Sequence, residues 1–214
     1  MKQFPVSLTP LLLVFAFALA QPARAQTPPN EPSDFFARIV VNAAPATFLE
    51  LVSSSPNVQW LPGSFMGNFF EDFTNKRARV EILALDGTPL QSVYFFYDKK
   101  VHYTWNYTNG SCHRAASTAP LHPFFNLGAA PQGPPNEVEV DQLGLSTWTF
   151  APAADAGWNA PTVNLTIATD SQQTPIAIQW AAPFAPKPAV MTFAMFASGA
   201  PDASLFNLPA GCAK

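Results

Sequence analysis

The amino-acid sequence predicts an all-β fold with a minor helix, in the form of an antiparallel sandwich or partial barrel. Short apolar segments with alternating polar residues recur along the chain, and Pro- and Gly-rich loops separate them. Asp86-Gly87 lies between two of these segments and is a strong signal for a hairpin turn. No long segment has the period of an amphipathic helix. Strands at this spacing are typical of antiparallel sandwiches and barrels.

The alternation predicts strands along most of the chain and one short helix near its start. The helix is expected over Ala46–Ser53. The strands are expected over Phe35–Val41, Arg79–Leu85, Gln91–Tyr97, Val101–Tyr107, Glu137–Asp141, Ser146–Phe150, Val163–Thr169, Ile176–Ala181 and Val190–Phe196.

The first 25 residues have the three parts of a secretory signal peptide. Lys2 supplies the positive start, Leu11–Ala20 is an uninterrupted apolar run, and Ala23-Arg24-Ala25 is an A-x-A cleavage site. A membrane anchor is the alternative, but a span needs roughly 20 apolar residues. We therefore expect residues 1–25 to be removed, no transmembrane segment to remain, and the protein to be secreted to the extracellular space or the endomembrane lumen.

The mature chain is expected to be one domain. Residues 26–34 are Pro-rich and polar, which predicts a disordered leader. Residues 35–214 have the length of a single domain with one sizeable core. Without the basic residues of the signal peptide, acidic residues outnumber basic ones, and no run of Lys or Arg exceeds two. This charge makes nucleic acid and anionic membrane surfaces poor partners.

The composition is unusually apolar for a secreted domain. Only 12% of the residues are charged, 13% are aromatic and nineteen are Phe. A typical soluble domain carries about 25% charged residues. Either glycans keep such a chain soluble, or part of the apolar surface lines a cavity.

Three sequons and two cysteines fit the secretory route. Asn106, Asn109 and Asn164 each begin an N-x-[ST] motif without Pro, which predicts N-glycosylation in a eukaryotic host. Cys112 and Cys212 form an isolated pair, which predicts one disulfide in an oxidising compartment. In the chain-entropy model, a disulfide that closes a loop of about 100 residues raises the free energy of unfolding by roughly 4–5 kcal/mol. Two unpaired thiols are the alternative.

The sequons also orient two predicted strands. Asn164 must face outward if it is glycosylated, so the residues on either side of it are expected to face inward. Asn106 shares its face with His102 and Thr104, so the intervening residues are expected inside as well. The same alternation adds residues from two further strands. The expected apolar pocket, or filled core, consists of Val101, Tyr103, Trp105, Trp148, Phe150, Val163, Leu165, Ile167, Ile178 and Trp180.

The sequence shows no motif of covalent chemistry. The three histidines, His102, His113 and His122, have no metal-ligand spacing. Gly63–Gly67 has its serine one place too early for a nucleophile elbow. We therefore expect no enzymatic activity and no required cofactor.

Three carboxylates are a candidate for a calcium site. Glu137, Glu139 and Asp141 alternate along one predicted strand and share its face. Carboxylates are ligands that calcium accepts. An ordinary solvated face explains the same pattern, and the two interpretations stay open.

Several motifs together resemble the ependymin-related proteins, in matching order over most of Asn42–Cys212. The motifs are Phe70-Glu71-Asp72, Arg77-Ala78-Arg79-Val80, Gly110–Arg114, Thr174-Pro175-Ile176 and Phe206–Cys212. The resemblance implies two curved antiparallel sheets that form a half-barrel or sandwich around an apolar pocket, similar to bacterial lipoprotein carriers. It also implies a secreted glycoprotein, often a homodimer, that associates with calcium and hydrophobic ligands.

The resemblance implies that Cys112 pairs with Cys212. The family usually has further disulfides, whose cysteines are absent here near Ala43 and Thr174. No calcium ligand can be transferred residue by residue.

The sequence thus favours a non-enzymatic carrier of a hydrophobic small molecule, such as a fatty acid or a lipid acyl chain. An apolar pocket with few polar groups is typical of such binding sites. The alternative is an extracellular matrix or cell-adhesion glycoprotein with a filled core and no ligand.

Overall fold

The computed structural model describes residues 32–42, 64–117, 136–140, 143–150, 165–169, 174–180 and 189–212. Of residues 136–140, 143–150, 165–168 and 180 it describes the backbone alone. The predicted signal peptide, most of the predicted leader and the helix expected over Ala46–Ser53 lie outside these ranges.

The described chain is all-β, as predicted. Two short 3₁₀ turns, η1 (Ala203–Phe206) and η2 (Ala210–Cys212), follow the last strand. The strands are β1 (Asp34–Val41), β2 (Phe65–Asp72), β3 (Arg77–Leu83), β4 (Pro89–Phe96), β5 (Val101–Asn106), β6 (Ser111–Ala116), β7 (Asn136–Val140), β8 (Leu143–Phe150), β9 (Leu165–Thr169), β10 (Pro175–Trp180) and β11 (Ala189–Ser198).

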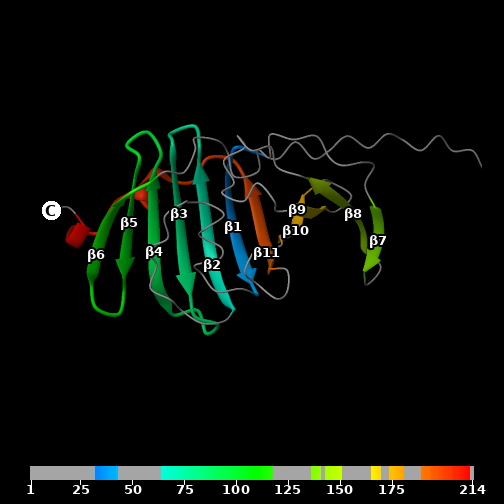
Figure 1. The fold of residues 1–214 in the computed structure, drawn as a ribbon, viewed down its shortest axis with the longest axis horizontal. Coiled ribbons are helices and arrows are strands. Elements are labelled where there is room, and N and C mark those ends of the chain that lie inside the picture. The colour runs from blue at the N-terminus through cyan, green and yellow to red at the C-terminus, as the bar shows by residue number, and fades with distance from the viewer. Residues whose placement is uncertain are drawn as a thin grey trace, which may run out of the picture.

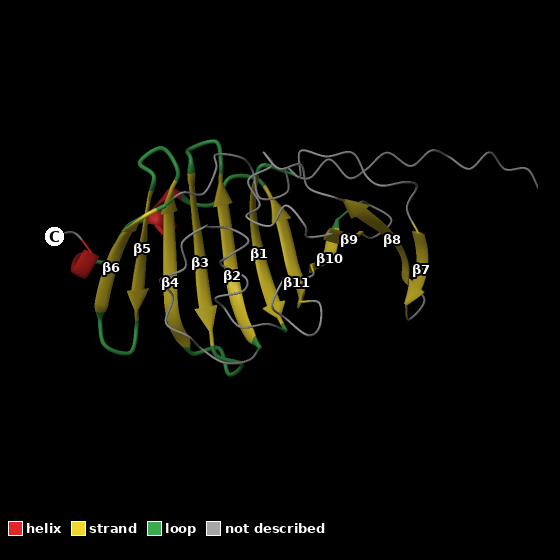
Figure 2. Ribbon diagram, viewed as in Figure 1, coloured by secondary structure: helices red, strands yellow, loops and turns green. Residues whose placement is uncertain are grey.

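These strands form one open antiparallel sheet of eleven strands (Figure 1). Their order is β6-β5-β4-β3-β2-β1-β11-β10-β9-β8-β7, so the first and last strands lie side by side. The sheet consists of two meanders that meet at β1 and β11. Its two outermost strands are β6 and β7, and the turns η1 and η2 lie toward the β6 edge (Figure 2).

Two strands were not expected from the sequence. β2 (FMGNFFED) lacks the alternation of a half-buried strand because six of its eight residues are buried. β6 (SCHRAA) is mostly exposed, as an edge strand with small and charged residues often is. The other predicted strands occur, with ends that differ by a few residues.

The alternate residues of the central strand β1 define the two faces of the sheet. Phe35, Ala37, Ile39 and Val41 have exposed fractions of 0%. We call the face that carries these residues, and all positions in register with them, the inner face. The outer face carries the alternate positions, starting from Phe36, Arg38 and Val40. Strand pairing extends both definitions across the sheet, because directly opposed residues in an antiparallel pair share a face.

The apolar core continues along the inner face. The Phe35 ring contacts Phe69 edge to face, with ring centroids 5.1 Å apart, and stacks on Phe196 at 5.2 Å. Full burial of such side chains contributes about 1.5–3 kcal/mol each. Other buried inner-face residues are Val80, Ile82, Val93, Phe95, Ile178 and Met191.

The outer face carries a row of polar contacts between neighbouring strands. Arg38 Nε donates to Asn68 Oδ1 at 3.1 Å, and Asn68 Nδ2 donates to Glu81 Oε2 at 2.8 Å. Glu81 also forms an ion pair with Arg79. These contacts join β1, β2 and β3 at the same level of the sheet.

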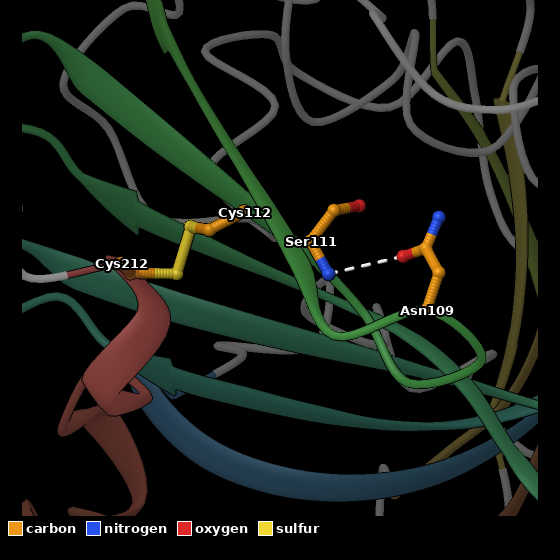
Figure 3. Close-up of a disulfide and its surroundings, with 4 residues drawn as sticks. All are labelled: Asn109, Ser111, Cys112 and Cys212. Atoms are coloured by element: carbon orange, nitrogen blue, oxygen red, sulfur yellow. Dashed lines mark hydrogen bonds between the residues drawn. A yellow bond between two sulfur atoms is a disulfide. The ribbon is translucent and has the colours of Figure 1, made fainter.

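A C-terminal strap, residues 199–212, lies on the outer face. Arg79 Nη1 donates to the Leu205 carbonyl at 2.8 Å, and the Arg77 guanidinium lies 4.4 Å from the centre of the Phe206 ring. The strap ends at Cys212, which forms a disulfide with Cys112 in β6 (Figure 3). The predicted pairing of the two cysteines is confirmed.

Among the described residues, no helix has the length and apolar character needed to cross a membrane.

We expect Gly67→Ala to lower the free energy of unfolding by about 1–3 kcal/mol, because overpacking forces backbone to shift. A Cβ at Gly67 would lie 2.5 Å from the backbone oxygen of Glu81 on β3. Urea unfolding measures the effect, with Ser198→Ala at the exposed end of β11 as the control. Equal stability of Gly67→Ala and the wild type would contradict the close approach of β2 and β3.

We expect the double variant Cys112→Ser/Cys212→Ser to lose about 2–5 kcal/mol of stability, because the disulfide closes a loop with a sequence separation of 100 residues. Non-reducing urea denaturation measures the loss. Limited proteolysis should then cut within the strap of the variant earlier than in the wild type. Identical proteolysis patterns would show that other contacts alone hold the strap.

Candidate functional site: the inner face and its polar cluster

Six of the seven positions predicted from the C-terminal meander lie within the described residues, and these six belong to the inner face. Register aligns Trp148 with Ile167, and Ile167 with Ile178. In the next row it aligns Phe150, Leu165 and Trp180. Ile178 pairs in turn with Met191, which pairs with Val41 in β1. The common face expected for these positions is therefore present, and it is continuous with the buried core.

The face expected for β5 was wrong. Val101, Tyr103 and Trp105 lie on the outer face, because Trp105 pairs with Ser92, and Ser92 pairs with Glu81. The strap explains the aromatic residues there: a Cβ at Gly211 would lie 2.7 Å from the Trp105 ring. Trp105 thus packs beneath the strap and not against the predicted pocket.

The reversal places polar side chains of β5 on the inner face. His102 pairs with Phe95, and Thr104 pairs with Val93. Both polar residues are buried, with exposed fractions of 3% and 5%. Gln91 on β4 pairs with Asn106, lies diagonally across the strand pair from Thr104, and is buried to a similar degree.

These three residues form an inner polar cluster: Gln91, His102 and Thr104. Gln91 Oε1, His102 Nδ1 and Thr104 Oγ1 are buried atoms without a hydrogen-bond partner in the described part of the chain. Leaving such an atom unpaired costs about 1–3 kcal/mol. Native proteins have few of these groups, so three on two adjacent strands require an explanation. The sequence did not predict this cluster, because the sequon at Asn106 had indicated that His102 and Thr104 face outward.

His102 is held in its neutral form. Burial lowers the pKa of His102 below its ordinary value of 6.5, and repulsion from His113 lowers this pKa further. His113 pairs with Thr104 from β6 and is exposed. The Phe95 ring lies 6.0 Å from the His102 ring, which adds an apolar neighbour.

The inner face also holds one buried acid. Tyr97 Oη donates to Glu71 Oε2 at 3.3 Å. Burial raises the pKa of Tyr97 well above its ordinary value, and the neighbouring Glu71 raises it further. Tyr97 therefore remains a neutral donor to Glu71.

The charged residues of β1–β6 are divided unequally between the faces. The arginines of these strands, Arg38, Arg77, Arg79 and Arg114, occupy outer-face positions, as pairing with Asn68, Asp72, Phe70 and Tyr103 shows. Lys76, Lys99 and Lys100 lie in turns. In this part of the chain the inner face thus combines apolar, neutral polar and acidic side chains.

The predicted glycosylation sites lie near the β5–β6 turn, where they are described. Asn109 is exposed, and its Oδ1 accepts a hydrogen bond from the Ser111 amide at 3.0 Å (Figure 3). Asn106 is half-buried, and its Oδ1 accepts from the Thr108 amide at 2.9 Å. Because Asn106 pairs with Gln91, it occupies an inner-face position and not the outward position expected from its sequon. Asn164 lies outside the described residues, as do Val163 and His122. Glycosylation itself stays a prediction.

The calcium candidates are described in part. Glu137 and Glu139 occupy alternate positions of β7, opposite Ser146 and Gly144, and Asp141 lies outside the described residues. Within the described ranges, no group of three His, Cys, Asp or Glu residues could hold a metal ion. The calcium site therefore stays a prediction.

No protein-family model and no curated protein matches the chain. Among solved structures, the chain is similar to an uncharacterized conserved protein from Thermus thermophilus, with a TM-score of 0.47 and 11% identity over 83% of this chain and 86% of that one. It is also similar to a DUF1329 family protein from Desulfovibrio piger, with a TM-score of 0.39 and 9% identity over 83% and 91% of the two chains. MucB, in complex with MucA(peri), has a TM-score of 0.35 and 12% identity over 84% of this chain and 54% of that one. The fold therefore rests on the strand pairing of this chain itself, and the resemblance to ependymin-related proteins stays a prediction.

We expect the stability of the wild type to fall as the pH drops below about 6.5, because the unfolded chain then binds a proton that folded His102 resists. The contribution of His102 to stability is complete at pH values above its ordinary pKa. It is lost as the pH falls toward the lower pKa that His102 has in the folded state. Urea unfolding between about pH 7.5 and about pH 5.5 should show a smaller loss in His102→Gln. Equal losses in both proteins would mean that His102 titrates normally. His113→Gln should show a loss between those of the other two proteins, because it removes only the repulsion that lowers the pKa of His102.

Proposed function

We propose that this protein is a secreted, non-enzymatic glycoprotein that binds a hydrophobic ligand, a fatty acid or a lipid acyl chain, on the inner face of its sheet. The observation that supports this proposal is the inner face itself. It is a continuous apolar surface that crosses many strands and ends, at β4 and β5, in polar side chains with atoms left unpaired by the described residues. An apolar site with a few convergent polar groups is the usual form of a small-molecule site.

The dimensions of the inner face suit an extended chain. Strands lie about 4.8 Å apart in a sheet, so the distance from β5 to β1 is about 19 Å. Val93, Val80, Phe69 and Ala37 form one row across this distance, beginning beside Thr104. A ligand along this row would meet apolar side chains for most of its length and polar groups at one end.

A second function is supported by the packing at β1. The residues there are fully buried and the Phe35 ring contacts two other rings, as in a filled core. An extracellular matrix or cell-adhesion protein without a ligand has such a core. The two proposals differ in whether purified protein carries or takes up a lipid.

We also propose the remaining properties that the sequence suggests. They are removal of residues 1–25, an extracellular location, N-glycosylation at one or more of the sequons, a homodimer, and calcium bound with help from Glu137, Glu139 and Asp141.

Millimolar calcium should raise the melting temperature of the protein if these three carboxylates bind calcium. Calcium and chelator should have equal effects if the three carboxylates form only a solvated face.

We expect Trp180→Ala to weaken the binding of a fluorescent fatty-acid analogue several-fold, because Trp180 occupies an inner-face position. Trp105→Ala is the matched control, since Trp105 lies on the outer face beside the strap. Its affinity should equal that of the wild type, although its stability should fall by about 3–5 kcal/mol as for other packed aromatic residues. Native mass spectrometry and fluorescence titration measure the two properties. No analogue binding and no co-purifying lipid in the wild type would favour the filled core.

A further inference from the structure

The inner polar cluster has the donors and acceptors to bind one small polar group. Gln91 Oε1 accepts hydrogen bonds, whereas Thr104 Oγ1 and the His102 ring can each donate or accept. Alternate residues of a strand lie about 6–7 Å apart on one face, and diagonal neighbours on paired strands about 7–8 Å apart. The three atoms, which the described residues leave unpaired, therefore belong to neighbouring positions of one face, where a single polar group could be their common partner.

The electrostatics of this face disfavour an anion. In strands β1–β6 the arginines are on the outer face, and Glu71 lies in the same inner-face row as Phe95 and His102. The buried His102 ring is neutral near pH 7. His113, which pairs with Thr104 from β6, is exposed to solvent. A carboxylate or phosphate would lose its hydration here without a buried cation from these strands to replace it.

We propose that the inner polar cluster binds the uncharged polar head group of a long-chain amphiphile, of the monoacylglycerol or fatty-alcohol class, whose chain lies along the apolar row of the inner face. This inference rests on the proposed function and narrows its ligand class. A hydroxyl group matches the cluster, because it can donate to Gln91 Oε1 and also accept from Thr104 Oγ1 or His102. A deprotonated fatty acid can only accept, so it would leave Gln91 Oε1 unpaired.

The first experiment compares three probes with the full mature chain at about pH 8, where oleate in solution is ionised. The probes are 1-monooleoylglycerol, oleyl alcohol and oleate, and native mass spectrometry with fluorescence titration measures their dissociation constants. The two uncharged probes should bind at least tenfold more tightly than oleate. Tighter or equal binding of oleate would overturn the inference and leave the proposed function standing. If none of the three probes binds, both this inference and the proposed function are overturned.

The second experiment removes the hydroxyl from the cluster. Thr104→Val keeps the shape of the side chain and should weaken 1-monooleoylglycerol about tenfold, while stability stays equal or rises because a buried unpaired group is removed. Thr104→Ser should restore affinity, and Thr192→Val on the exposed outer face of β11 should change neither property. Unchanged affinity in Thr104→Val, or a loss of stability that shows a bound water as the partner, would overturn the assignment. Gln91→Leu tests it independently.

Discussion

The hydrogen-bonded position of β1 between β2 and β11 is the constraint on which the rest of the structure depends. β1 comes first in the chain and pairs along its whole length with β2 on one side and with β11 on the other. The two meanders therefore become one sheet of eleven strands. Because the inner side chains of β1 are fully buried, a one-residue slip in register would place Arg38 in the core and expose Phe35 and Ile39. The register of this strand thus determines which residues of every other strand face the core.

The two faces of the sheet satisfy their polar groups in different ways. On the outer face, Arg38, Asn68, Glu81 and Arg79 form contacts from strand to strand, and Arg79 also holds the carbonyl of Leu205 in the strap. The disulfide then ties the end of the strap to the edge strand β6. On the inner face, the buried polar atoms of the inner polar cluster have no such partners within the described ranges. Polar contacts therefore join the strands of the outer face, although the described residues leave Arg79 Nε unpaired there. The inner polar cluster instead leaves a buried atom unpaired in each of its three residues.

This division gives the functional proposals their physical basis. A face that serves only as a filled core has no reason to retain neutral donors and acceptors, because buried polar groups lower stability unless they are paired. The cluster lies beside Val93 and Phe95, so polar and apolar groups meet at one end of the sheet. An amphiphile has the same division in its own structure. The filled-core alternative requires instead that the cost of the cluster be balanced by packing elsewhere, for which the aromatic contacts of Phe35 are the best candidate.

The sequence by itself determined the all-β class, the bounds of most strands and the pairing of Cys112 with Cys212, because these depend on local alternation, turn residues and cysteine count. It also grouped Ile178 and Trp180 correctly, since every second residue of a strand shares a face. Only the tertiary structure decided which face of β5 is the inner one. The period of two separates Tyr103 and Trp105 from His102 and Thr104, but it does not say which set meets the core. Pairing with β4 decides it, because Trp105 pairs with Ser92 on the outer face. There Trp105 lies against Gly211 of the strap, a contact between residues far apart in the chain that no local pattern contains.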